Sequence, residues 1–269
     1  MATQSKTTPV AKQIDGLVTL SGALSGHLQK IEAQFLATIP FLPIEGGILE
    51  IGSFKGKSTI ILAKAAAMAG HGRIYACDPL SLPCSTDPTD ATKEQLPEIF
   101  FNNLREHEVE EDVVFFQMRS ETLAGTWDRP LKALWIDGDH TYEGVMTDLT
   151  GFEKHLLPGS VICFHDVLHE FEGPIRVFME RILLSSKYGD CGLCGSIGWA
   201  QFVGDGPVTT QQWKSKFSQY QKLSKLLVLV VKHKNGFKVN KSLRRFYRRL
   251  VSHGPIVPDD WLSERSSGF

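Results

Sequence analysis

Two apolar segments of this chain each run directly into a cluster of carboxylate and imidazole side chains. Residues 131–136 and 160–164 are short apolar runs bounded by polar residues, a pattern typical of buried strands in a parallel sheet. Ligands of open α/β sheets bind just beyond the carboxyl ends of such strands. Oxygen ligands and bases gathered at that edge favour metal-assisted chemistry. The side chains that follow the two runs are Asp137, Asp139, His140, His165 and Asp166.

The composition is that of an ordinary globular protein. With 269 residues, 42% of them hydrophobic and 22% charged, the chain suffices for one large α/β domain with additions or for two small domains. Residues 1–6 lack the apolar core of a signal peptide, and the longest aliphatic run, residues 226–231, is far too short to span a bilayer. The five cysteines are odd in number and scattered, unlike a disulfide framework. We therefore expect a cytoplasmic protein with no transmembrane segment.

The net charge of -1 conceals a strong asymmetry along the sequence. Residues 1–206 carry 16 Lys and Arg against 27 Asp and Glu, whereas residues 207–258 carry 12 Lys and Arg and no acid. This split favours a separate C-terminal element that faces an anionic partner. The alternative is that the basic segment packs on the acidic body of its own chain or of a twin subunit.

The order of expected helices and strands defines the fold class. Apolar residues recur at helical spacing from Ile14 to Phe35, which predicts one or two opening helices. Strands that alternate with helices predict an α/β fold with a doubly wound, mainly parallel sheet. A long loop is expected over residues 80–92, and two strands, 227–231 and 236–239, are expected to pair around a turn. Other strands are expected over residues 47–52, 73–77, 113–117, 131–136, 160–164 and 196–203, and helices over 58–68, 94–105, 142–155, 174–184, 211–226 and 242–251.

A glycine-containing turn follows the first expected strand. Residues 48–59 combine a strand, the pattern E-x-G-x-x-x-G and a helix start, so the backbone can approach a ligand and the helix N-terminus favours polar or anionic groups. A P-loop needs four residues between its glycines, but Gly52 and Gly56 are separated by three. The dinucleotide fingerprint, with one residue between its first two glycines, is absent as well. A strand–turn–helix without a ligand would also tolerate these glycines.

Asp78 ends the second expected strand. A carboxylate at that position can accept hydrogen bonds from both ribose hydroxyls of a bound nucleoside. The competing interpretation is a turn or cap aspartate before Pro79. Together with the glycine turn upstream, Asp78 favours nucleoside binding.

These motifs resemble one enzyme family. The glycine pattern resembles motif I of class I S-adenosylmethionine-dependent methyltransferases, and the order of elements from Gly47 to Val203 is similar to theirs. Residues 135–145 and 157–167 resemble the subgroup that contains macrolide-sugar O-methyltransferases and cephalosporin-hydroxylase-like proteins. The resemblance implies a Rossmann-like methyltransferase fold over residues 46–206, an N-terminal helical cap over 1–45 and a basic C-terminal extension over 207–269.

The resemblance also implies roles for particular residues. In this subgroup the first acid of the D-G-x-H motif binds a divalent cation and the histidine three residues later is the general base, which corresponds to Asp137 and His140 here. Asp139 matches a cofactor contact in the more distant catechol-type branch, and the turn at residues 118–120 would border the adenine. The cofactor-binding residues implied are Glu50, Gly52, Ser53, Gly56, Ser58, Asp78, Arg119, Ser120 and Asp139.

The second half of the predicted metal site departs from the family. Relatives commonly place two acids, or an acid and an amide, after the fifth strand, whereas this chain has His165 and Asp166. Asp166 can be the second ligand to Mg²⁺, while His165 suits Mn²⁺, iron or zinc better. The alternative is that Asp166 caps the next loop and His165 is a satisfied strand-end histidine.

The function expected from these residues is O-methylation of a small molecule or sugar, with S-adenosylmethionine as cofactor and a divalent cation, Mg²⁺ or Mn²⁺. Two other classes stay open: a metal-dependent hydroxylase or hydrolase, and a non-catalytic cofactor-binding scaffold with a basic tail. Cys191 and Cys194 lack a second ligand pair, so they are expected to be loop thiols. The basic run from Lys241 to Arg249 carries no RNA-binding signature. We also expect a homo-oligomer.

Overall fold

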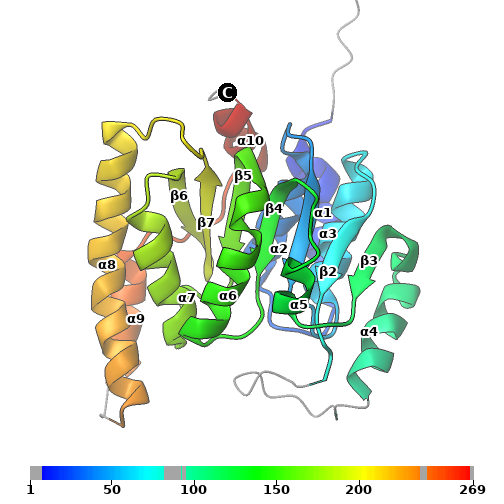
Figure 1. The fold of residues 1–269 in the computed structure, drawn as a ribbon, viewed down its shortest axis with the longest axis horizontal. Coiled ribbons are helices and arrows are strands. Elements are labelled where there is room, and N and C mark those ends of the chain that lie inside the picture. Colours follow the sequence, from blue (N-terminus) through cyan, green and yellow to red (C-terminus); the bar gives the residue numbers. More distant parts are fainter. Residues whose placement is uncertain (1–7, 82–91, 93–94, 237–240, 267–269) are drawn as a thin grey trace, which may run out of the picture.

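A seven-stranded sheet forms the centre of the molecule (Figure 1). The computed structural model describes residues 8–81, 92, 95–236 and 241–266. The strand order is β3-β2-β1-β4-β5-β7-β6, and β7 runs antiparallel to both of its neighbours. The strands are β1 (Gly47–Ile51), β2 (Ile74–Cys77), β3 (Val113–Phe116), β4 (Leu131–Ile136), β5 (Leu156–Phe164), β6 (Tyr188–Cys194) and β7 (Ile197–Phe202). The predicted doubly wound, mainly parallel sheet is confirmed.

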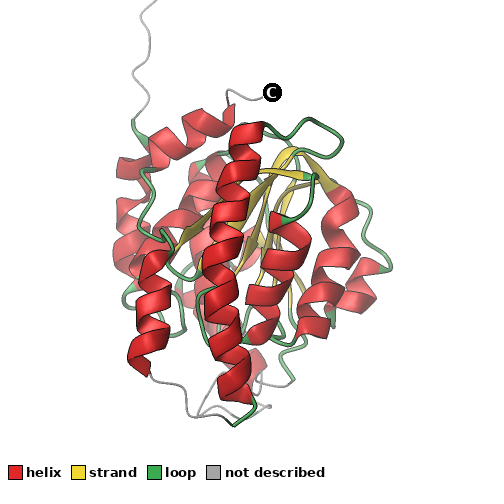
Figure 2. Ribbon diagram, turned by 90° about the vertical axis from the view of Figure 1, so that its left-hand side faces the viewer, coloured by secondary structure: helices red, strands yellow, loops and turns green. Residues whose placement is uncertain are grey.

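Helices cover both faces of this sheet (Figure 2). Along the strands, alternate side chains enter two separate cores. On β4, Trp135 packs in the core shared with the first helices, while Leu134 and Ile136 pack in the core on the other face. The helices are α1 (Val10–Ser21), α2 (Lys30–Thr38), α3 (Lys57–Met68), α4 (Gln95–Glu106), α5 (Ser120–Ala124), α6 (Tyr142–Phe152), α7 (Glu172–Val177), α8 (Thr210–Lys234), α9 (Lys241–Leu250) and α10 (Pro258–Ser266). Short 3-10 turns (Ile39–Phe41, Glu110–Asp112, Glu153–His155) and a π-helix (Phe178–Leu183) supplement them.

The register of the central strands decides which residues meet at the edge of the sheet. Ile51 of β1 pairs with Ile136 of β4, and Ile136 pairs with Phe164 of β5. The three strands therefore end level with one another. The glycine turn after β1 and the two polar clusters after β4 and β5 consequently share one edge.

The prediction for Cys191 and Cys194 was wrong, because both lie in the edge strand β6 and not in a loop. Gly189, Asp190 and Gly192 give this segment a low strand propensity. Pairing with β7 supplies the stabilisation that propensity lacks. The described cysteines are free thiols.

The predicted strand over residues 227–231 is also wrong, because α8 continues without a break to Lys234. Leu223, Leu226 and Val230 are fully buried at helical spacing on the side of α8 that faces the core. Their packing stabilises a helix although the segment contains β-branched residues, which favour strands. The partner strand predicted at 236–239 falls almost entirely outside the described residues, since 237–240 are not described.

The C-terminal helix α10 returns to the N-terminal helices. The carboxylate of Asp259 accepts hydrogen bonds from the backbone N–H groups of Val10 and Ala11, which caps α1. Trp261 packs edge-on against Phe35 of α2. None of the described helices is both long and apolar enough to cross a membrane. The division into segments 1–45, 46–206 and 207–269 stays a prediction.

Candidate active site

A cavity lies at the carboxyl edge of the sheet, between the glycine turn and the two polar clusters. The segment that joins α1 to α2, residues 25–28, lines the same cavity. The glycine turn and the acid–histidine clusters, predicted separately, therefore face one space. The predicted site residues that line it are Gly52, Ser53, Ser58, Asp137, His140, His165 and Asp166.

Gly52 allows the turn after β1 to approach the end of β4. Its φ is 88°, and a Cβ atom there would lie 2.2 Å from the carbonyl oxygen of Asp137. Any side chain at this position would force the two strand ends apart. Gly56, with φ of 86°, begins α3 in the left-handed region, and no side chain caps that helix. The first N–H groups of α3 are thus left to donate hydrogen bonds to a polar group on the cavity side, where Lys57 and Ser58 lie.

Asp78 supports the same turn from the end of β2. One carboxylate oxygen accepts hydrogen bonds from the backbone N–H groups of Ser53 (2.8 Å) and Phe54 (2.9 Å), and the other accepts from Leu80 (2.7 Å). The cap role weighed for Asp78 is therefore present in the structure. Each carboxylate oxygen has further acceptor capacity, so these bonds are compatible with contact to a ribose.

Glu50 lies beneath the turn and does not line the cavity. One oxygen accepts from the hydroxyls of Ser53 (3.0 Å) and Thr59 (2.5 Å), while the other is buried with no hydrogen-bond partner among the described residues. Burial raises the pKa of the Glu50 carboxyl to about 7. Glu50 is thus a buried carboxyl beneath the turn that is mostly protonated only below neutral pH.

The raised pKa of Glu50 makes a testable prediction about stability. The folded-state pKa lies above its ordinary value of 4.5, so the free energy of unfolding falls as the pH rises from about 4.5 to about 7. Glu50→Gln removes this loss and is expected to raise the free energy of unfolding at pH 8 by about 3 kcal/mol. Urea denaturation as a function of pH measures it, with the exposed Glu98→Gln as control. A parallel pH dependence in both variants would contradict this account.

Three remaining predicted cofactor residues do not line the cavity. Arg119 is exposed and forms an ion pair with Glu121. Ser120 begins α5, beside the buried carboxyl of Asp148. Asp139 is exposed and accepts a hydrogen bond from the backbone N–H of Thr141 (2.8 Å) at the start of α6.

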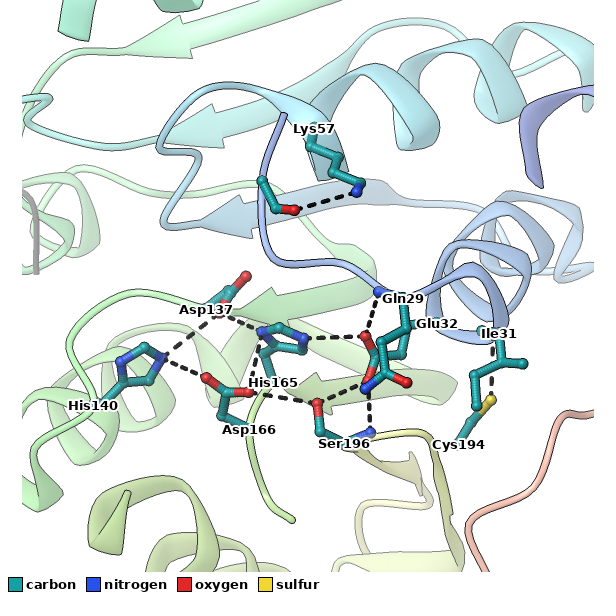
Figure 3. Close-up of polar contacts among 11 residues, drawn as sticks. Gln29, Ile31, Glu32, Lys57, Asp137, His140, His165, Asp166, Cys194 and Ser196 are labelled. Carbon is teal, nitrogen blue, oxygen red and sulfur yellow. Dashed lines mark hydrogen bonds and ion pairs between the residues drawn. The ribbon is translucent and has the colours of Figure 1, made fainter. Parts of the chain in front are cut away.

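The acid–histidine cluster is a network of close ion pairs (Figure 3). The Nε2 atom of His140 lies 3.3 Å from Asp166 and 3.8 Å from Asp137. The His140 ring stacks flat on Phe171, with centroids 4.3 Å apart. His140 is therefore held by a carboxylate at one end and an aromatic face at its side.

His165 connects this network to a residue that sequence analysis missed. Its Nδ1 lies 2.9 Å from an oxygen of Asp137, and its Nε2 faces Glu32 of α2 at 3.5 Å. Glu32 is fully buried and also accepts hydrogen bonds from the backbone N–H (2.6 Å) and hydroxyl (2.8 Å) of Ser196. The available signal was the spacing of Gln29 and Glu32, which form a capping box at the start of α2.

The electrostatics of the cluster favour charged side chains. Burial alone would lower the pKa of His165, but the Asp137 and Asp166 carboxylates raise it well above its ordinary value. Burial opposes the charged form of Asp137 and Glu32 as well, yet contact with His165 holds the pKa of both carboxyls below its usual range. The network is thus a buried imidazolium among carboxylates.

Backbone strain gathers at the same edge. Among the described residues other than glycine, four have positive φ, and three of them border the site: Phe54 (47°), Leu80 (49°) and Asp166 (59°). Such conformations cost free energy and persist where the surrounding structure enforces them, which is common in functional sites. For Asp166 the strained backbone directs the carboxylate toward His140.

The predicted metal ligands do not fit a cation in this arrangement. Among the described residues, no group of three or more His, Cys, Asp and Glu side chains is placed to hold a metal ion. The ligand atoms predicted for Asp137 and His165 are hydrogen-bonded to each other, and Asp166 is paired with His140. We therefore derive no chemical step through a cation, and this arrangement does not support the predicted Mg²⁺ or Mn²⁺.

Comparison with known proteins agrees with the fold. Residues 49–167 match a protein family described as a methyltransferase domain. The solved structure of the O-methyltransferase NovP is similar, with a TM-score of 0.56 and 13% identity over 72% of this chain and 99% of that chain. Cofactor-bound Rv0187 from MTB has a TM-score of 0.53 and 17% identity over 76% and 94% of the two chains. The O-methyltransferase TomG from Streptomyces achromogenes, solved in complex with SAM, has a TM-score of 0.50 and 18% identity over 75% and 93%.

The fold and the family match define the class of protein. At these identities the solved structures establish the shared fold, and the family match places a methyltransferase domain on the glycine turn and both polar clusters. The chain thus has a methyltransferase-like fold, and residues 49–167 match a methyltransferase domain. The methyltransferase domain predicted from the sequence is confirmed for these residues.

Proposed function

We propose that this protein transfers a methyl group from S-adenosylmethionine to a hydroxyl oxygen of a small molecule or sugar. The observation that carries the proposal is the His140–Asp166 pair, 3.3 Å apart, on a cavity that the glycine turn also lines. A hydroxyl is a poor nucleophile at neutral pH, so its methylation benefits from a base placed beside the methyl donor. The solved relatives NovP and TomG are O-methyltransferases, which agrees with this choice of acceptor atom.

The residues of this chain divide the work of binding and proton transfer. The uncapped N-terminus of α3, with Gly52, Ser53 and Ser58 on the cavity, suits the carboxylate of the methyl donor. Asp78, which holds the backbone of Ser53 and Phe54 beside the cavity, suits its ribose. S-adenosylmethionine supplies a methyl group already activated by its sulfonium. His140 takes the proton of the acceptor hydroxyl as the oxygen bonds to the methyl carbon, and Asp166 stabilises the imidazolium that forms.

The direct test is methyl transfer with labelled S-adenosylmethionine. The protein is incubated with a panel of phenols, catechols and sugars, and products are identified by mass spectrometry. We expect an O-methylated product together with S-adenosylhomocysteine. Calorimetry separates the alternatives: no binding of S-adenosylmethionine would favour a hydroxylase or hydrolase, while binding without transfer to any acceptor would favour a non-catalytic scaffold.

Chelation tests the predicted cation separately. Because the carboxylates of Asp137 and Asp166 are already paired with histidines, turnover is expected to persist in EDTA, with metal content verified by elemental analysis. Binding of S-adenosylmethionine, measured in the same samples, should also be unchanged. Turnover that is lost in EDTA and restored by Mg²⁺ or Mn²⁺ would show that the cation rearranges these pairs and takes part.

A further inference from the structure

Helix α9 presents an uncovered apolar strip. Leu243, Phe246 and Leu250 are 41%, 53% and 40% exposed, and their spacing of three and four residues places them on one side of the helix. Tyr247, which neighbours Phe246 on α9, instead packs against the hydrophobic core to which α8 contributes. The strip therefore flanks the buried face of α9 and lies open along the outside of the molecule.

The same segment is strongly basic. Residues 207–258 hold 12 Lys and Arg and no Asp or Glu. On the outside of α9, Arg245 and Arg249 are exposed next to the apolar strip, and Lys225 and Lys232 are exposed on α8. Apolar side chains flanked by cations form the pattern of helices that lie in the interface of anionic bilayers.

The two helices lie side by side and form one edge of the molecule (Figure 1). Beyond β6, the last strand of the sheet, α8 runs along this edge, and α9 returns beside it in the opposite direction. The end of α8 and the start of α9 lie at the same end of the molecule as the carboxyl ends of the parallel strands (Figure 1). A surface that contacts α9 would therefore approach the end of the molecule that holds the cavity.

We propose that the α8–α9 pair is a membrane-binding surface that docks on a bilayer rich in anionic lipid. Charge decides between the possible occupants. A second copy contacting through the same surface would bring two basic segments together without a counter-charge. Nucleic acid would satisfy the arginines but would leave Leu243, Phe246 and Leu250 without an apolar partner. A bilayer with anionic headgroups provides both a counter-charge for the basic side chains and an apolar environment for Leu243, Phe246 and Leu250.

Co-sedimentation of the full chain with lipid vesicles tests the proposal. We expect binding to vesicles of phosphatidylcholine with phosphatidylserine, little binding to phosphatidylcholine alone, and weakening as salt is raised. The double variant Leu243→Asn, Phe246→Asn should lower the partition coefficient by about tenfold or more. The double variant Arg245→Gln, Arg249→Gln should lower it by on the order of tenfold and flatten the salt dependence.

Matched surface variants serve as controls. Leu184 is 44% exposed at the end of the π-helix, so Leu184→Asn removes a comparable apolar side chain elsewhere. Arg73→Gln with Arg181→Gln removes two exposed charges away from α9. Equal binding by the α9 variants and their controls, or binding to neither kind of vesicle, would overturn the proposal. So would tight RNA binding, or self-association that the α9 variants abolish, in the absence of vesicle binding.

Discussion

Replacement of His140 by alanine is expected to lower the rate of methyl transfer by about 10²- to 10⁴-fold, the range for loss of a general base. The imidazole is held against Asp166 at 3.3 Å and stacked on Phe171, and it lines the cavity in which we place the methyl transfer. Because we assign binding of the methyl donor to the N-terminus of α3 and to Asp78, and not to the imidazole, calorimetry should show nearly unchanged affinity for S-adenosylmethionine. In a plot of kcat/KM against pH, the acidic limb, which reports protonation of the base, should disappear.

The control for this variant is His169→Ala. His169 is exposed and also stacks on Phe171, with centroids 5.0 Å apart, but it does not line the cavity. Its replacement should leave turnover near that of the native protein. His165→Ala is the informative comparison, because His165 is bonded to Asp137 and faces Glu32. If His140→Ala kept near-native turnover while His165→Ala lost it, the assigned roles would be reversed.

The parts of the site that depend on strand ends were predictable from sequence. Asp137 and His165 directly follow β4 and β5, and the parallel register of these strands places their ends level. Gly52 follows β1 by the same rule. A short apolar run and its terminal polar residue lie next to each other in the sequence, so local pattern is enough to locate them.

Features that depend on distant partners could not be predicted in this way. Strand β6 forms because its backbone pairs with β7, although its glycines have a low propensity for strands. The end of α8, which contains β-branched residues, is helical because one side of the helix is buried in the core. Glu32 meets Ser196 across 164 residues of sequence, and nothing near Glu32 in the chain marks that contact.

Glu32 carries the second large expected effect. Its carboxylate is fully buried, accepts two hydrogen bonds from Ser196 and faces the imidazolium of His165. Glu32→Ala would leave a buried charge and three donors, two on Ser196 and the backbone N–H of Gln29, without their partner. Removal of one member of a buried pair costs about 3–5 kcal/mol of the free energy of unfolding. Glu121→Ala, which removes an exposed ion pair with Arg119, should cost no more than about 1 kcal/mol. Urea denaturation at pH 7 compares the two.

The variant Glu32→Gln separates charge from packing. It keeps the shape of the side chain and one acceptor oxygen for Ser196, but it lacks the charge that faces His165. The pKa of Glu32 lies below its ordinary value of 4.5, so native stability from this group is present above that pH and is lost as the pH falls through the lowered folded-state value. Glu32→Gln should be less stable than the native protein at pH 7, and the difference should shrink in acid. A difference independent of pH would mean that α2 is held by packing and hydrogen bonds, without a contribution from the ion pair with His165.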